Sequence, residues 1–103
     1  MGNTYSKGRK AEQQVAQILR RAGASVKVSP GSRGAADLHA DFGTKKWDVQ
    51  VKAGKNAPTQ LTGIDKQRLN SKATKNNTTP VLATVKNGKV EFRSNRCGRK
   101  LSP

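Results

Sequence analysis

Residues 47–53 alternate strictly between apolar and polar side chains, and this alternation constrains the fold more than any other segment of the chain. The apolar members are Trp47, Val49, Val51 and Ala53, and the polar members are Asp48, Gln50 and Lys52. Residues two apart on a β-strand share a face. The segment therefore predicts a strand with one face in the core and one polar face, and a polar inner face is costly unless it is solvated or functional.

Apolar spacing and turn residues predict the elements that precede this strand. The expected elements are a helix over 6–22, strands over 25–29 and 36–40, and a turn at 41–45. Ser6 is the expected cap of the helix, and Gly23 is its expected stop. Val26 and Val28 are expected to point inward, and a Pro-Gly-Ser-Arg-Gly loop at 30–34 separates the first two strands.

A second helix and a hairpin are expected after this strand. Thr62 and Asp65 resemble a capping box at the start of a helix through about Thr74. Asn87-Gly88 between two apolar runs, 80–85 and 89–93, is a strong hairpin signal. The order α-β-β-β-α-β-β predicts an α/β fold, with a mixed central sheet of about five strands flanked by helices. One domain is expected over 1–103, with residues 1–5 and 95–103 as loose tails.

The charge of the chain narrows the choice of partner. Lys and Arg total 21 against 6 Asp and Glu, a formal net charge of +15. Nucleic acid is the expected partner, and an anionic membrane is a weaker candidate because no basic amphipathic helix carries bulky apolar anchors. No apolar run approaches the roughly 20 residues of a transmembrane helix, and the polar N-terminus lacks a signal-peptide core. We therefore expect an intracellular protein, and its single cysteine, Cys97, cannot form an internal disulfide.

The supply of large apolar side chains is small. Leu, Ile, Val and Phe together number 18 in 103 residues. A chain of this size buries barely enough surface to fold alone, so the core is expected to be thin. A homodimer is expected to bury more apolar surface, through the 64–74 helix and the exposed edge of the sheet.

Four polar residues are expected to converge near the alternating strand. Asp37 begins the strand that pairs with 47–53 across the turn, which places it close to Gln50. Glu12 lies beside apolar residues of the first helix and points toward the sheet. An acid, a second oxygen ligand and the amine of Lys52 suit a hard divalent cation and a phosphodiester. Mg²⁺ is the expected cofactor, with Mn²⁺ as a possible substitute.

This pattern resembles a known nuclease family. Asp37, twelve further residues and Gln50-Val51-Lys52 are similar to the D…(D/E)xK signature of the restriction-endonuclease-like superfamily. Within it, the chain resembles the archaeal-type Holliday junction resolvases over about residues 5–93. The matching stretches are Lys7–Glu12, Val28–Ser32, Ala36–Leu38, Val49–Lys52 and Pro80–Ala83.

The resemblance implies a restriction-endonuclease-like fold and a Mg²⁺-dependent endonuclease that cuts branched DNA, the four-way junction, as a homodimer. It implies Lys52 as the catalytic lysine, Glu12, Asp37 and Gln50 as metal-site groups, and Ser32 as a residue near the scissile phosphate. The expected DNA contacts are Arg9, Lys10, Ser29, Arg33 and Lys55. The chain departs from the family at Gln50, where Glu is usual, and this removes one negative charge from the site.

Other interpretations of the same residues remain open. Glu12 could pair with Arg9, Asp37 could cap a turn, and Gln50 could belong to a solvated strand face. Asp48 has no match in the motif and is expected to be structural or solvated, while His39 is expected to be a bystander or a phosphate contact. For the whole chain, the alternatives are a duplex or single-strand nuclease on the same fold and a non-catalytic basic DNA-binding module.

Overall fold

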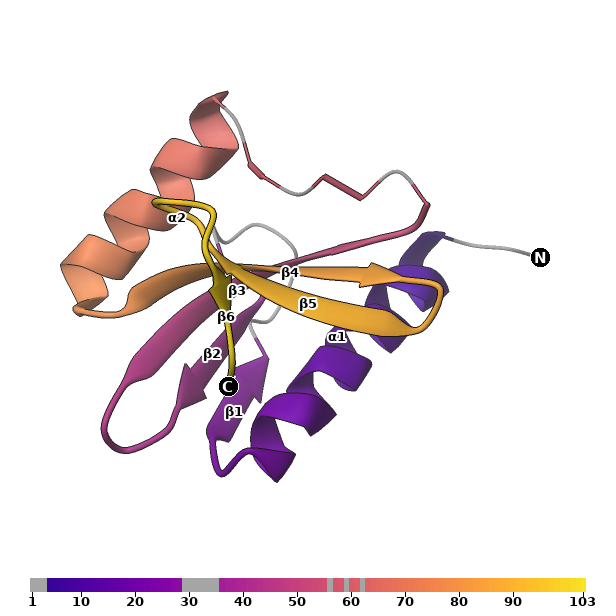
Figure 1. The fold of residues 1–103 in the computed structure, drawn as a ribbon, viewed down its shortest axis with the longest axis horizontal. Coiled ribbons are helices and arrows are strands. Elements are labelled where there is room, and N and C mark those ends of the chain that lie inside the picture. The colour runs from indigo at the N-terminus through magenta and orange to yellow at the C-terminus, as the bar shows by residue number, and fades with distance from the viewer. Residues whose placement is uncertain (1–3, 29–35, 56, 59, 62) are drawn as a thin grey trace.

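The computed structural model describes residues 4–28, 36–55, 57–58, 60–61 and 63–103, and side chains of the first helix from Lys10 onward. Two helices flank a six-stranded sheet in this part of the chain (Figure 1). The elements are α1 (Thr4–Arg21), β1 (Ser25–Val28), β2 (Leu38–Asp41), β3 (Lys46–Ala53), α2 (Gly63–Asn76), β4 (Thr79–Lys86), β5 (Lys89–Ser94) and β6 (Lys100–Leu101).

The six strands lie in the sheet in the same order as in the chain, from β1 to β6. All neighbouring strands pair antiparallel except β3 and β4, which are parallel and are joined through α2. A parallel pair needs such a crossover, whereas antiparallel neighbours need only a tight turn. The expected mixed α/β sheet is confirmed, with one strand more than the sequence predicted.

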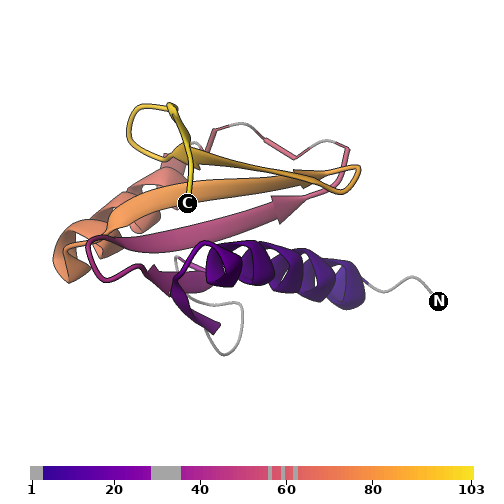
Figure 2. The same ribbon diagram turned by 60° about the horizontal axis from the view of Figure 1, so that its bottom comes forward.

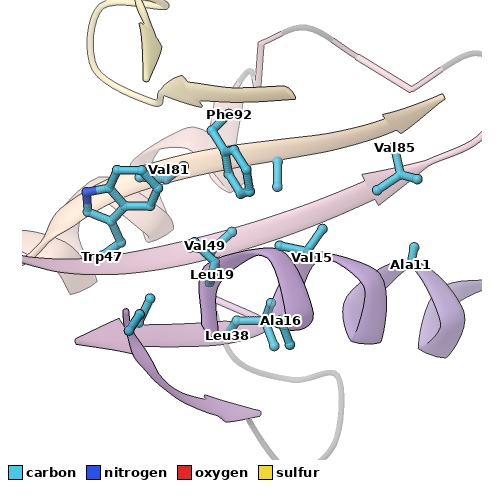
Figure 3. Close-up of a cluster of buried hydrophobic side chains, with 13 residues drawn as sticks. Ala11, Val15, Ala16, Leu19, Leu38, Trp47, Val49, Val81, Val85 and Phe92 are labelled. Atoms are coloured by element: carbon cyan, nitrogen blue, oxygen red, sulfur yellow. The ribbon is translucent and has the colours of Figure 1, made fainter. Parts of the chain in front are cut away.

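The main core lies between α1 and one face of the sheet (Figure 3). Val15 and Leu19 are fully buried on α1, and Val49 is fully buried on β3. The Trp47 ring contacts the Phe92 ring with centroids 5.8 Å apart, which ties β3 to β5. Figure 2 shows α1 running along this side of β3. Trp47, Val49 and Val51 of the alternating segment therefore lie in this core, as predicted, whereas Ala53 at the end of the strand is exposed.

A smaller cluster lies on the opposite face, under α2. It consists of Ala36, Leu61, Leu69 and Leu82. Leu69 is fully buried, together with Ala73 one turn later, but most of the remaining α2 side chains are exposed. The polar set of the alternating segment shares this face, because Gln50 is in register with Leu82 of β4. The α2 face of the sheet is thus only partly covered by apolar side chains.

The turns follow local residue chemistry. Gly23 has φ +101° after α1, and the Ala24 amide donates to the Leu19 carbonyl at 3.0 Å, which closes the helix end. Asn87 and Gly88 both have positive φ, as a type I′ hairpin turn requires, so the predicted hairpin is confirmed. The expected capping residue Thr62 and the expected 30–34 loop lie outside the described residues.

Three local predictions are wrong. Helix α1 begins at Thr4, so Ser6 lies inside it and is not its cap. Val28 is half exposed, because it ends an edge strand that has a neighbour on one side only. The segment 95–103 is not a loose tail, because Lys100 and Leu101 pair with β5 and Asn95 is buried.

Candidate active site

The pairing of β2 with β3 places Asp37 beside the polar face of β3. Leu38 pairs with Val49, so Asp37 lies across from Gln50, as the sequence predicted. The Asp37 amide donates to the Val49 carbonyl at 2.8 Å, which extends the ladder by one residue before β2. The Val51 amide donates to Asp37 Oδ2 at 2.9 Å. The carboxylate is therefore fixed against the β3 backbone between Gln50 and Lys52.

The environment of Asp37 opposes its ionisation. Burial raises the pKa of the Asp37 carboxyl, and this effect exceeds the opposing hydrogen bond from Val51 and the attraction of the Lys52 ammonium. Gln50 and Lys52 are both half-buried on the same face. A carboxylate, an amide and an ammonium thus lie side by side in a partly desolvated place. Perturbed carboxyl groups of this kind are enriched at functional sites.

Glu12 occupies a different position from these strand residues. It is half-buried on α1, and α1 packs against the Val49 face of the sheet. Asp37, Gln50 and Lys52 project from the opposite face. The structure therefore brings three of the predicted site residues together on one face and leaves Glu12 on the helix that covers the other.

The predicted DNA-contact residues are described only in part. Lys10 is exposed on α1, and Lys55 is exposed just after β3. Ser29, Ser32 and Arg33 lie outside the described residues, as does the side chain of Arg9. Both described lysines are available to solvent, which is what a phosphate contact requires.

The donor groups at Asp37 suit one kind of metal ion. Among the described residues, no group of three or more His, Cys, Asp or Glu side chains could hold a metal by itself. Mg²⁺ needs only one or two carboxylates, because substrate phosphates and water complete its shell. The Asp37 carboxylate and the Gln50 amide oxygen are hard donors that fit Mg²⁺ or Mn²⁺.

Asp48 has a structural role that the sequence indicated only loosely. Asp48 is 1% exposed, its Oδ1 lies 2.6 Å from His39 Nδ1, and its Oδ2 accepts from Asn76 Nδ2 at 3.3 Å. It joins β2, β3 and the end of α2. The His39 ring borders a cavity of about 320 Å³ that Lys27 and Lys46 also line. Asn76 could not be found from the sequence, because the contact depends on how α2 crosses the sheet.

The fold has a counterpart among solved structures. Archaeoglobus fulgidus Hjc, a Holliday junction resolvase from an archaeal hyperthermophile, superposes with a TM-score of 0.76 at 19% sequence identity. The match covers 85% of this chain and 77% of that one. The chain has the fold of this resolvase. The expected restriction-endonuclease-like architecture is therefore confirmed.

Comparisons with families and with curated proteins gave a different result. No family model matches the chain, and no curated protein does. Among the described residues, neither helix is long and apolar enough to cross a membrane.

Proposed function

We propose that this protein is a metal-dependent endonuclease that resolves four-way DNA junctions by hydrolysing a pair of phosphodiester bonds. The observation that carries the proposal is the convergence of Asp37, Gln50 and Lys52 on one polar face of the sheet. The fold shared with a Holliday junction resolvase supports the same reaction class. The net charge of +15 supports a polyanionic substrate.

Each residue of the site has a role in this proposal. The Val51 amide holds the Asp37 carboxylate in place, and the Lys52 ammonium orients the attacking water and offsets charge on the reacting phosphate. Asp37 and Gln50 would hold Mg²⁺ or Mn²⁺, which activates water and neutralises phosphate charge when bound. Ser32 is proposed to lie near the scissile phosphate, whereas Glu12, on the helix that covers the other face, is given no role in this step. The proposed backbone contacts are Arg9, Lys10, Ser29, Arg33 and Lys55.

A homodimer forms part of the proposal. A four-way junction has two scissile phosphates on opposed strands, and this chain carries one candidate site. Paired incision therefore requires two subunits related by a two-fold axis. The two surfaces proposed for the subunit contact are α2 and an edge of the sheet. They carry Ile64 and Val28, the exposed large hydrophobic side chains among the described residues. Sedimentation at micromolar concentration is expected to give the mass of a dimer, and a monomer on junction DNA would contradict paired cutting.

A cleavage assay with matched variants tests the site. Labelled four-way junction and duplex are incubated with Mg²⁺, with Mn²⁺ or with chelator. Asp37→Asn and Lys52→Ala are expected to reduce junction cleavage by at least about 10²–10³-fold and to leave junction affinity within a few-fold. The controls Asp41→Asn and Lys46→Ala make the same side-chain changes at exposed positions of the same strand pair. Near wild-type cutting by either site variant would show that the assignment is wrong.

A non-catalytic DNA-binding module is the second candidate function, and Gln50 is the observation that favours it. Its amide carries no charge, so Asp37 is the charged one of the two proposed ligands, and the Asp48 carboxylate on the same face is already bonded to His39 and Asn76. Gln50→Glu supplies a second negative ligand and is expected to keep or raise Mg²⁺-dependent cleavage. If the wild type binds junctions without cutting them and Gln50→Glu then cuts, the native chain is a binding module on a nuclease fold.

A further inference from the structure

The turn between β5 and β6, residues 95–99, is joined to the rest of the fold through one buried residue, Asn95. Asn95 is 6% exposed, and its backbone amide donates to the Pro80 carbonyl at 2.8 Å. Its Nδ2 donates to the Lys66 carbonyl at 3.3 Å and to Asn70 Oδ1 at 3.0 Å. Three hydrogen bonds thus join the turn to both β4 and α2. Buried polar groups satisfied in this way specify a single arrangement.

This fastened turn presents two exposed arginines. Arg96 Nη2 donates to Thr74 Oγ1 on α2 at 2.8 Å, and the Arg96 amide donates to Ser94 Oγ at 3.2 Å. Arg99 lies at the other end of the turn, where its carbonyl accepts from the Ser94 amide at 2.8 Å. A guanidinium has five N–H donors, so the bond to Thr74 leaves Arg96 others for a phosphate. Both positions are set before any ligand binds.

Several basic side chains gather around the turn. The α2–turn surface consists of Lys66, Arg93, Arg96, Arg99 and Lys100. Glu91 is the neighbouring acid, with its carboxylate 2.6 Å from Arg93 Nη2 and 3.8 Å from Lys100 Nζ. One carboxylate against five cations leaves the surface strongly positive. Such a surface suits a row of phosphates.

The α2–turn surface and the candidate active site lie on opposite sides of α2. Asn76 of α2 bonds to Asp48 of β3, so one flank of the helix faces the strands of the site. Thr74 and Asn70 bond to the turn, so the other flank faces β5 and β6. In the sheet, β4 separates β3 from β5. Figure 1 shows α2 and this turn side by side.

We propose that the α2–turn surface binds the phosphate backbone of a second duplex arm of a branched DNA, while the cleaved strand lies at Asp37. This inference rests on the proposed function and adds the feature that selects branched over linear DNA. Two arms that diverge at a junction can lie on the two sides of α2, whereas one straight duplex follows one side. Because Asn95 fixes the backbone of the turn and Thr74 holds the Arg96 guanidinium, less conformational entropy is lost when this surface binds.

The test compares binding to a four-way junction and to a linear duplex of equal length, by fluorescence anisotropy in chelator. Arg96→Gln/Arg99→Gln removes two charges from the α2–turn surface. Arg20→Gln/Arg21→Gln removes two exposed charges from the end of α1, on the other face of the sheet, and is the matched control. We expect the first variant to lose at least about tenfold in junction affinity, and the salt dependence of its junction binding to have a slope about 2 smaller. Its duplex affinity should change little. The control should change both affinities alike.

Two further outcomes separate this inference from the proposed function. Equal losses on junction and duplex, or wild-type junction binding by Arg96→Gln/Arg99→Gln, would overturn the second-arm surface even if the wild type cuts junctions. A selective loss of junction affinity would uphold the surface even if no metal supports cleavage.

Thr74→Ala keeps every charge and removes the hydrogen bond that holds the Arg96 guanidinium. It is expected to give a smaller loss of junction affinity in the same direction, and an unchanged affinity would show that the fixed arginine geometry is not used.

Discussion

The two faces of β3 differ in what they contribute to the molecule. On the α1 face, Trp47 and Val49 are buried among side chains of α1 and β5, and the contacts are apolar. On the α2 face, Gln50 and Lys52 are half-buried next to a carboxylate that burial makes harder to ionise. Apolar burial is the main source of folding free energy, whereas a desolvated charge reduces it. One strand therefore supplies stability on one side and carries the candidate site residues on the other.

The largest expected change in stability comes from the α1 face. Leu19 is fully buried against the sheet, and Leu19→Ala removes three side-chain carbons and leaves a cavity. The free energy of unfolding is expected to fall by about 2–5 kcal/mol, a large part of the total for a chain of this size. Urea denaturation measures this loss, with Gln17→Ala on the exposed side of α1 as the control. A loss below about 1 kcal/mol would mean that the core is not concentrated on this face.

Much of the fold could be predicted from local patterns. The alternation at 47–53 correctly separated Val49 from Gln50, and Asn87-Gly88 located the hairpin, because these signals depend on neighbouring residues alone. The 95–99 turn was wrongly expected to be loose. Its anchor, Asn95, is buried only because α2 lies over it, and no short-range pattern carries that information.

The candidate site could likewise be predicted only where it depends on local patterns. Asp37 opposite Gln50 follows from the turn that joins the two strands, so their pairing could be derived from residue counts. The burial that raises the pKa of Asp37 could not be derived from the sequence, because it depends on the packing around the β2–β3 pair. Asn76 was likewise missed as a partner of Asp48, since the two are 28 residues apart and meet only through the α2 crossover.

Asp48 is the exception on the α2 face, because it is a buried polar group that serves stability. Asp48→Ala removes the acceptor of both His39 and Asn76 and is expected to cost about 1–3 kcal/mol of unfolding free energy. Asp48→Asn keeps the shape and one acceptor oxygen, so its loss should be smaller. Both values come from denaturation curves measured in chelator. If Asp48→Ala unfolds at the wild-type urea concentration, the contacts of Asp48 contribute nothing to stability.

The smallest expected effect has the opposite sign and concerns Asp37. Because burial raises the folded-state pKa of this carboxyl, the ionised form opposes folding, and the penalty grows as pH rises through the folded-state pKa. Asp37→Asn removes the charge and keeps an oxygen that can accept from the Val51 amide. At neutral pH, we therefore expect a gain of about 0.5 kcal/mol, or roughly 2–4 °C in the melting temperature, together with the loss of cleavage.

The pH dependence of this gain in stability shows whether it comes from the burial of the Asp37 charge or from the change in net charge. Below the unfolded-state pKa, near 3.8, the carboxyl is protonated in both states, so the gain of Asp37→Asn should disappear. Thermal denaturation in chelator at pH 7 and at acid pH measures both values, and Asp41→Asn controls for a general change in net charge. A gain that persists unchanged in acid, or one that Asp41→Asn reproduces, would assign the effect to overall charge. A gain confined to neutral pH at Asp37 would show that this face holds the Asp37 carboxylate at the expense of stability supplied by the α1 face.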